Sequence, residues 1–116
     1  MGEALMPRRG GSDLNGLTFE LVHYDGYCGA GGMRSVSGCD FMNGCYIVIA
    51  SAVGNPKEDG GSLMRIAIAV LVDGEPIYGN HVATVNTDGK LEVLVPTTNG
   101  FTSTADSGFC VYKVCI

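Results

Sequence analysis

The sequence predicts an all-β fold, an antiparallel β-sandwich or jelly-roll-like barrel of about seven strands with an extended N-terminal arm. Eighteen glycines are spread over 116 residues, and the longest stretch without Gly or Pro, residues 62–73, has twelve residues. Stretches of this length suit strands better than helices. Alternating apolar residues between regularly spaced turn signals are typical of sandwiches and barrels.

The first half of the chain predicts three strands. Residues 17–24 alternate between apolar and polar positions and indicate a half-buried strand. A Gly-rich loop from Asp25 to Gly44 follows, with a short strand expected near residues 33–37. Residues 45–53 are almost continuously apolar, so we expect both faces of that strand to be covered.

The central hairpin has the clearest pattern. Residues 64–72 place Ile and Val at every second position and small alanines between them, which favours a strand whose alanine face packs closely on another layer or subunit. Asp73-Gly74 predicts a tight hairpin turn, after which residues 77–85 are expected to form one returning strand.

The last strands are predicted from similar signals. A second turn at residues 86–89 leads into a strand at residues 90–95, and residues 97–107 form a Thr/Ser-rich loop. Residues 109–116 close the chain as a strand, with Cys110, Tyr112, Val114 and Ile116 expected to face inward and Lys113 outward.

The domain organisation is expected to be simple. Residues 1–16 are rich in Gly, carry no periodic apolar face and indicate an extended arm, with Arg8 and Arg9 as its candidate partner-binding residues. The alternative is a flexible terminus with no function. Residues 17–116 are expected to form a single β-sandwich domain.

Composition argues against two classes of partner. The net charge is −5, from twelve acidic and seven basic residues, whereas binding to a nucleic-acid backbone needs a basic surface. No apolar run approaches the roughly 20 residues that span a bilayer, and no signal peptide is recognised. We therefore expect synthesis in a cytoplasm without a signal peptide, and neither nucleic acid nor membrane as a partner.

Cysteines and aromatic residues surround the long loop. A disulfide between Cys28 and Cys39, or between Cys39 and Cys45, would close the loop, although free thiols are the default. His23 with these three cysteines lacks the close Cys-x2–4-Cys pair of a structural zinc site, so no metal is expected. The four aromatic residues at the loop form a candidate binding site or, alternatively, cap one end of the sandwich: Tyr24, Tyr27, Phe41 and Tyr46.

Catalytic motifs were sought and none was found. The two histidines, His23 and His81, lie within strand patterns, and the acidic residues cluster in turns. Nucleophilic catalysis needs a nucleophile, a base and an orienting group brought together. We therefore expect a non-enzymatic protein without a cofactor.

One resemblance specifies a function. The hairpin signals around Asp73-Gly74 and Asp88-Gly89 resemble those of phage capsid-decoration and tail-fibre β-sandwich domains, over residues 62–116. The resemblance implies a virion protein that binds and stabilises the capsid or forms part of a fibre. The implied partners are other virion proteins, such as the major capsid protein, and further copies of the chain, with a trimer favoured.

A soluble binding module is the alternative function. In that interpretation the loops at residues 25–44 and 97–107 lie at one end of the sandwich and bind a glycan or a small ligand. The oligomeric state separates the two interpretations, because an assembly protein forms a stable oligomer and a binding module can remain a monomer.

Overall fold

A computed structural model describes residues 16–26, 32–54, 63–99, 101 and 106–115 of the chain. These residues form eight strands and no helix, so none of them supplies a helix that is long and apolar enough to cross a membrane. The strands are β1 (Thr18–Asp25), β2 (Gly32–Val36), β3 (Cys45–Gly54), β4 (Leu63–Val72), β5 (Glu75–Tyr78), β6 (Ala83–Val85), β7 (Leu91–Val95) and β8 (Asp106–Cys115). The all-β prediction is confirmed.

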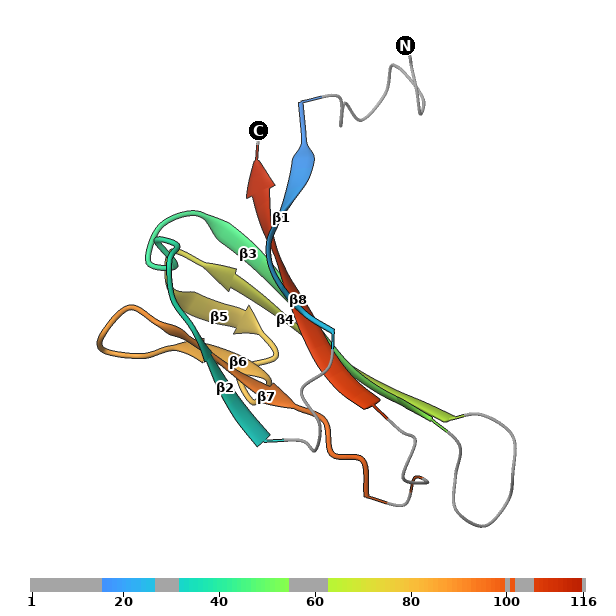
Figure 1. The fold of residues 1–116 in the computed structure, drawn as a ribbon. Helices are drawn as coiled ribbons and strands as arrows, with labels where there is room; N and C mark the ends of the chain where they lie inside the picture. Colours follow the sequence, from blue (N-terminus) through green and yellow to red (C-terminus); the bar gives the residue numbers. More distant parts are fainter. Residues whose placement is uncertain (1–15, 27–31, 55–62, 100, 102–105, 116) are drawn as a thin grey trace.

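The strands form two antiparallel sheets. The larger sheet has the order β1-β8-β3-β4-β5 and the smaller one has the order β2-β7-β6 (Figure 1). The C-terminal strand β8 returns to the middle of the larger sheet, where it pairs with both β1 and β3. The two sheets pack as a sandwich in which the smaller sheet covers one face of the larger one.

The core lies between the sheets and is built from one face of each strand. Alternate residues of β3 and β4, among them Val48, Ala50, Ala69 and Leu71, are almost completely buried. The smaller sheet contributes its own set from β2, β6 and β7: Val36, Ala83, Leu91, Val93 and Val95. The alanines of the larger sheet leave room for the branched side chains of the smaller one.

The turn at Asp73-Gly74 agrees with its prediction and joins two loops. Both residues have positive φ, as a tight hairpin between twisted strands requires. The Asp73 carboxylate accepts a hydrogen bond from the backbone N–H of Gly44 at 2.8 Å, and the Asp73 N–H donates to the Gly44 carbonyl at 2.8 Å. A side chain at Gly74 would collide with the sulfur of Met42. The long loop is thereby held against the hairpin.

The prediction of one strand over residues 77–85 is wrong. The chain leaves the larger sheet after Tyr78, turns at Gly79 with a φ of 73°, and enters the smaller sheet as β6 at Ala83. The turn passes so close to the backbone of Ile68 that only glycine fits at position 79. His81 lies in this turn and is exposed.

The inward orientation predicted for the last strand is also wrong. On the core face of β8, Ser107, Phe109 and Val111 are buried, whereas Cys110, Tyr112 and Val114 are half-buried and lie on the opposite face. Ile116 lies outside the described residues. Both faces of this strand are apolar, so alternation could not tell the core face from the other one. The same ambiguity affects β3 and β4.

Candidate functional site

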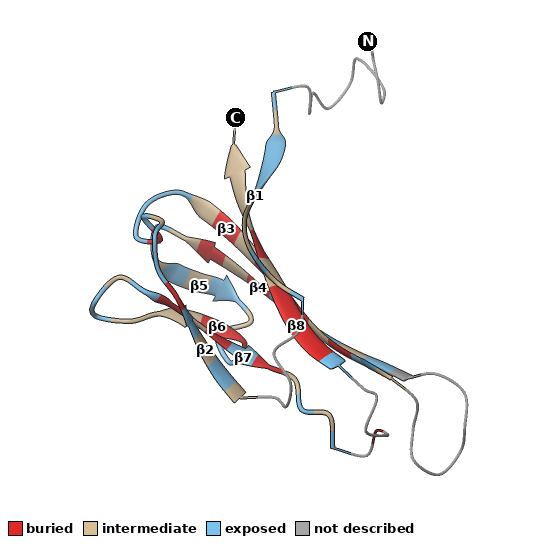
Figure 2. Ribbon diagram, viewed as in Figure 1, coloured by how far each residue is buried: buried red, intermediate tan, exposed pale blue. Residues whose placement is uncertain are grey.

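The larger sheet has a second apolar face that the smaller sheet does not cover. On β4 the exposed residues Met64, Ile66 and Ile68 alternate with the buried or half-buried Arg65 and Ala67. Their partners across the sheet on β3 belong to the same outward-facing set. We call this side of the larger sheet the outer face. Figure 2 colours the strands by burial and shows the first half of β1, at the edge of the larger sheet, as exposed.

Strand register assigns the members of the outer face. Eight large apolar residues on it are 41–71% exposed: Phe19, Leu21, Tyr24, Val53, Met64, Ile66, Ile68 and Tyr78. Half-buried residues from β3, β4 and β8 fill the area between them: Cys45, Ile47, Ile49, Val70, Val72, Cys110, Tyr112 and Val114. A contiguous apolar surface of this size marks a binding surface in a soluble protein.

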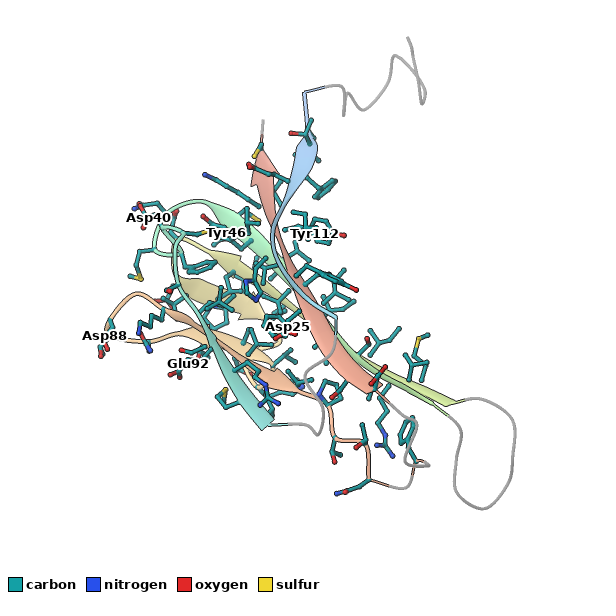
Figure 3. All side chains as sticks on the ribbon, in the orientation of Figure 1. Asp25, Asp40, Tyr46, Asp88, Glu92 and Tyr112 are labelled. Carbon is teal, nitrogen blue, oxygen red and sulfur yellow. The ribbon has the colours of Figure 1, made fainter. Side chains whose placement is uncertain are left out.

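The outer face has a groove and a ridge. The groove has a volume of about 320 Å³ and lies over β8, between Phe19 on one side and Ile47 and Ile49 on the other, with Tyr112 in it. The ridge is the row of exposed side chains on β4. Tyr112 lies away from the Asp40 loop, whereas Tyr46 lies toward it (Figure 3).

Charged groups on the outer face lie only at its margins, as far as the described residues show. Glu75 lies on the edge strand β5, where it pairs with Val72, and Asp106 lies at the start of β8, where it pairs with Val53. Both are exposed. An apolar centre with polar margins is the usual arrangement of a protein–protein interface.

The aromatic residues singled out in the sequence do not form one surface. Phe41 and Tyr46 are 1% and 2% exposed, and their rings contact each other with centroids 4.9 Å apart. This burial removes both from any ligand-binding surface and places them at the end of the core. Tyr24 is exposed on the outer face, and Tyr27 lies outside the described residues.

Tyr46 is held in a polar niche at the end of the core. Its hydroxyl donates a hydrogen bond to the Asp40 carbonyl at 3.1 Å, and Asn43 donates to the Asp40 carboxylate at 2.7 Å. Burial raises the pKa of the Tyr46 phenol, and the nearby Cys39 and Asp40 raise it further. The niche keeps the phenol neutral and stabilises the loop before β3.

Cysteine and metal chemistry is limited in the described part of the chain. Cys39 and Cys45 are not bonded to each other, so the Cys39–Cys45 disulfide is absent. The Cys28–Cys39 disulfide stays a prediction, because Cys28 lies outside the described residues, as do Arg8 and Arg9. The described His, Cys, Asp and Glu residues form no group of three or more that could hold a metal ion.

A second depression lies at the open side of the sandwich. Its volume is about 410 Å³, and Ile66 and Ala67 of β4 form one wall, while Val82, Leu94 and Val95 form the other. His81 and Thr97 contribute polar groups at its edge. It adjoins the β4 ridge but opens between the two sheets.

Sequence reasoning singled out none of the outer-face residues of β3, β4 and β8 as a site. The available signal was that residues 45–53 and 64–72 are apolar on both faces. In an antiparallel sheet with only one covered face, the other face is usually polar. No protein-family model, curated protein or solved structure matches the chain.

Proposed function

We propose that the protein is a non-enzymatic structural component of a phage virion, which binds and stabilises the capsid or forms part of a fibre. The observation that carries the proposal is the outer face, a sheet surface with large exposed apolar side chains. Such a surface is costly to leave exposed to water, whereas an assembly covers it permanently. The hairpin resemblance of residues 62–116 is the reason for proposing a virion among the possible assemblies.

The chemistry of the described surface supports a binding role. The outer face offers a broad apolar contact area, and its hydrogen-bonding groups include the hydroxyls of Ser51 and of three tyrosines, so it suits the surface of another protein. Binding to a shell or fibre needs area and shape rather than reactive groups. The arm carrying Arg8 and Arg9 is proposed to add a second contact, with acidic groups of a neighbouring subunit.

The test is the composition of purified particles. Phage particles from cells that express the chain are purified on a density gradient and washed in about 1 M salt. Their protein composition is then measured by quantitative mass spectrometry. We expect a fixed copy number per particle that survives the wash, because salt at this concentration screens ionic contacts but not apolar ones. A chain that is abundant in the lysate but absent from the particles would contradict the proposal.

A small-ligand binding module is the second candidate, and the depression between the sheets favours it. A volume of about 410 Å³ with apolar walls is in the usual range of ligand pockets. The test is binding of an apolar fluorescent probe, with Ala67→Trp as the variant that fills the depression. Tight binding by the native chain that Ala67→Trp abolishes would support this candidate, and equal weak binding by both would exclude it.

A further inference from the structure

We propose that the outer face binds the outer face of a second copy of this chain, with a two-fold axis that lies between the two sheets and runs along β3, over Ile49. The inference deepens the proposed function and rests on it only in taking the outer face as the assembly surface. The resulting unit is a pair of sandwiches joined through their larger sheets. Three observations carry it: area, charge and strand register.

The exposed area matches the requirement of a stable pair. A large apolar side chain has roughly 200 Å² of surface, so the eight half-exposed residues present roughly 800 Å². A standard protein–protein interface buries about 800 Å² on each partner. One further copy therefore covers the face without another component.

The charge pattern fits an identical partner. In a two-fold interface each residue of the face meets a residue of the same face, so an uncharged centre meets an uncharged centre. A charged side chain of a different partner, placed against the centre of the outer face, would lose its hydration and find no opposite charge to pair with. Glu75 and Asp106 lie at the margins, where both acids can stay in water.

A bilayer surface fits the face less well. Proteins that lie on membranes combine an apolar face with Lys or Arg around it and with interfacial Trp. The margins of the outer face carry acids, the chain has no Trp and its net charge is −5. These features oppose contact with anionic lipids.

Strand register locates the axis. Ile49 is in the central strand of the face and pairs with Ile68 of β4 on one side and with Cys110 of β8 on the other. A two-fold axis that packs two identical faces together lies in the plane between them. A half-turn about such an axis along β3 places β4 of one copy over β8 of the other, so Ile68 lies over Cys110. One pair further along the strands, Val70 lies over Tyr112, because both of these residues pair with Ile47.

The same half-turn places β4 of one copy over the groove of the other. Ile68 and Val70 of one copy come to lie over Cys110 and Tyr112 of the other, and the reciprocal contacts form at the same time. Tyr112 lines the groove, and Ile68 is the ridge residue that lies nearest to it in this arrangement. Two packed sheets cross at about 30°, which leaves this central contact intact.

The first experiment measures self-association of the full chain by sedimentation equilibrium. Ile66→Lys places a charge in the proposed interface, and Met33→Lys is the matched control, because Met33 is also 58% exposed but lies on the smaller sheet. We expect a dimer for the native chain and for Met33→Lys. Ile66→Lys is expected to weaken the dimer by at least about 100-fold, because each dimer contains the substitution twice.

A monomer of the native chain at about 100 μM would overturn the proposal, because interfaces of this size bind in the micromolar range or tighter. A trimer, or a dimer that Ile66→Lys leaves intact, would also overturn it. Binding of the native monomer to phosphatidylcholine–phosphatidylserine vesicles would assign the face to lipid instead. Circular dichroism of each variant establishes that it is folded.

The second experiment tests the register by mixing two variants. Val70→Lys and Tyr112→Glu are each expected to be monomeric, whereas their mixture brings the substituted ammonium and carboxylate together in one heterodimer. The heterodimer should bind at least about 10-fold more tightly than either variant binds itself. Two variants that stay monomeric when mixed would overturn the assigned axis.

The two proposals fail independently. A chain that dimerises as described but is absent from particles leaves the inference standing and removes the virion function. A chain that occurs in particles but is monomeric in solution removes the inference and leaves the function.

Discussion

The assignment of the two faces of β4 predicts unequal costs for two truncations that remove the same number of carbons. Leu71 is 1% exposed on the core face, and Ile66 is 58% exposed on the outer face of the same strand. Leu71→Ala and Ile66→Ala each remove three carbon atoms, and Ile66→Ala also removes a β-branched residue, which by strand propensity alone would make it the costlier of the two. The difference between them reports which face is the core.

The expected costs follow from burial. Three buried carbons are worth about 2.4 kcal/mol in transfer free energy, and the cavity left at a closed site adds to this, so Leu71→Ala is expected to cost about 3–4 kcal/mol. Less than half of Ile66 is buried, and water can enter the vacated space. Ile66→Ala is therefore expected to cost about 1 kcal/mol in the monomer.

The assay is urea unfolding followed by circular dichroism. It is performed at a protein concentration low enough that the native chain is monomeric, because dimerisation would stabilise the native state and add to the apparent cost of Ile66→Ala. Equal costs, or a larger cost for Ile66→Ala, would refute the assignment of the alanine-rich face to the core.

Three further predictions concern the rest of the sandwich. The raised pKa of Tyr46 means that the folded state holds the phenolic proton more tightly than the unfolded state, so the free energy of unfolding should fall as the pH rises above about 10. Tyr46→Phe should remove the contribution of this group to the fall, as measured by denaturation at several pH values. The same pH dependence of stability in Tyr46→Phe would contradict the prediction. The Arg65 guanidinium lies 4.5 Å from the centroid of the Phe101 ring and donates a hydrogen bond of 2.7 Å to the Thr97 carbonyl. Arg65→Met should therefore lower the free energy of unfolding by about 1–2 kcal/mol. An unchanged free energy of unfolding would argue against the contact. Gly79→Ala should lower the free energy of unfolding by more than about 2 kcal/mol, because a side chain there meets the backbone of β4. Gly38 also has a positive φ but has open space around it, so Gly38→Ala should lower the free energy of unfolding by only about 1 kcal/mol. Similar losses for the two variants in thermal unfolding would show that the close approach at Gly79 is unimportant.

The strands and turns were predictable because their signals are local. Asp73-Gly74 specifies a tight turn by its own φ preferences, and the alternation of residues 64–72 specifies a strand without reference to the rest of the chain. The break in the predicted strand at residues 77–85 was missed because the reason for it is tertiary. Gly79 turns there because the chain passes close to the backbone of Ile68 and Ala69 on the neighbouring strand β4, a contact that the local sequence around Gly79 does not reveal.

The outer face was not predictable as a candidate site, although its signal was present in the sequence. Alternation separates the two faces of a strand but does not say which face is covered when both are apolar. In β4 the core takes the smaller side chains, Ala67 and Ala69, and leaves the larger Ile66 and Ile68 outside. Hydrophobicity alone favours the opposite arrangement, with the isoleucines in the core and the alanines outside. The outward position of the isoleucines is explained by the proposal that a second layer covers the outer face.

The most direct test of the central claim, that the outer face is covered by a second copy, is the oxidation rate of two methionines. Met64 on the outer face and Met33 on the smaller sheet are 56% and 58% exposed in the single chain, so hydrogen peroxide should oxidise them at similar rates if the chain is alone. At a concentration where the chain is dimeric, peptide mass spectrometry should show Met64 oxidised at least about 10-fold more slowly than Met33, with the rates converging on dilution. Equal rates at every concentration would contradict the claim.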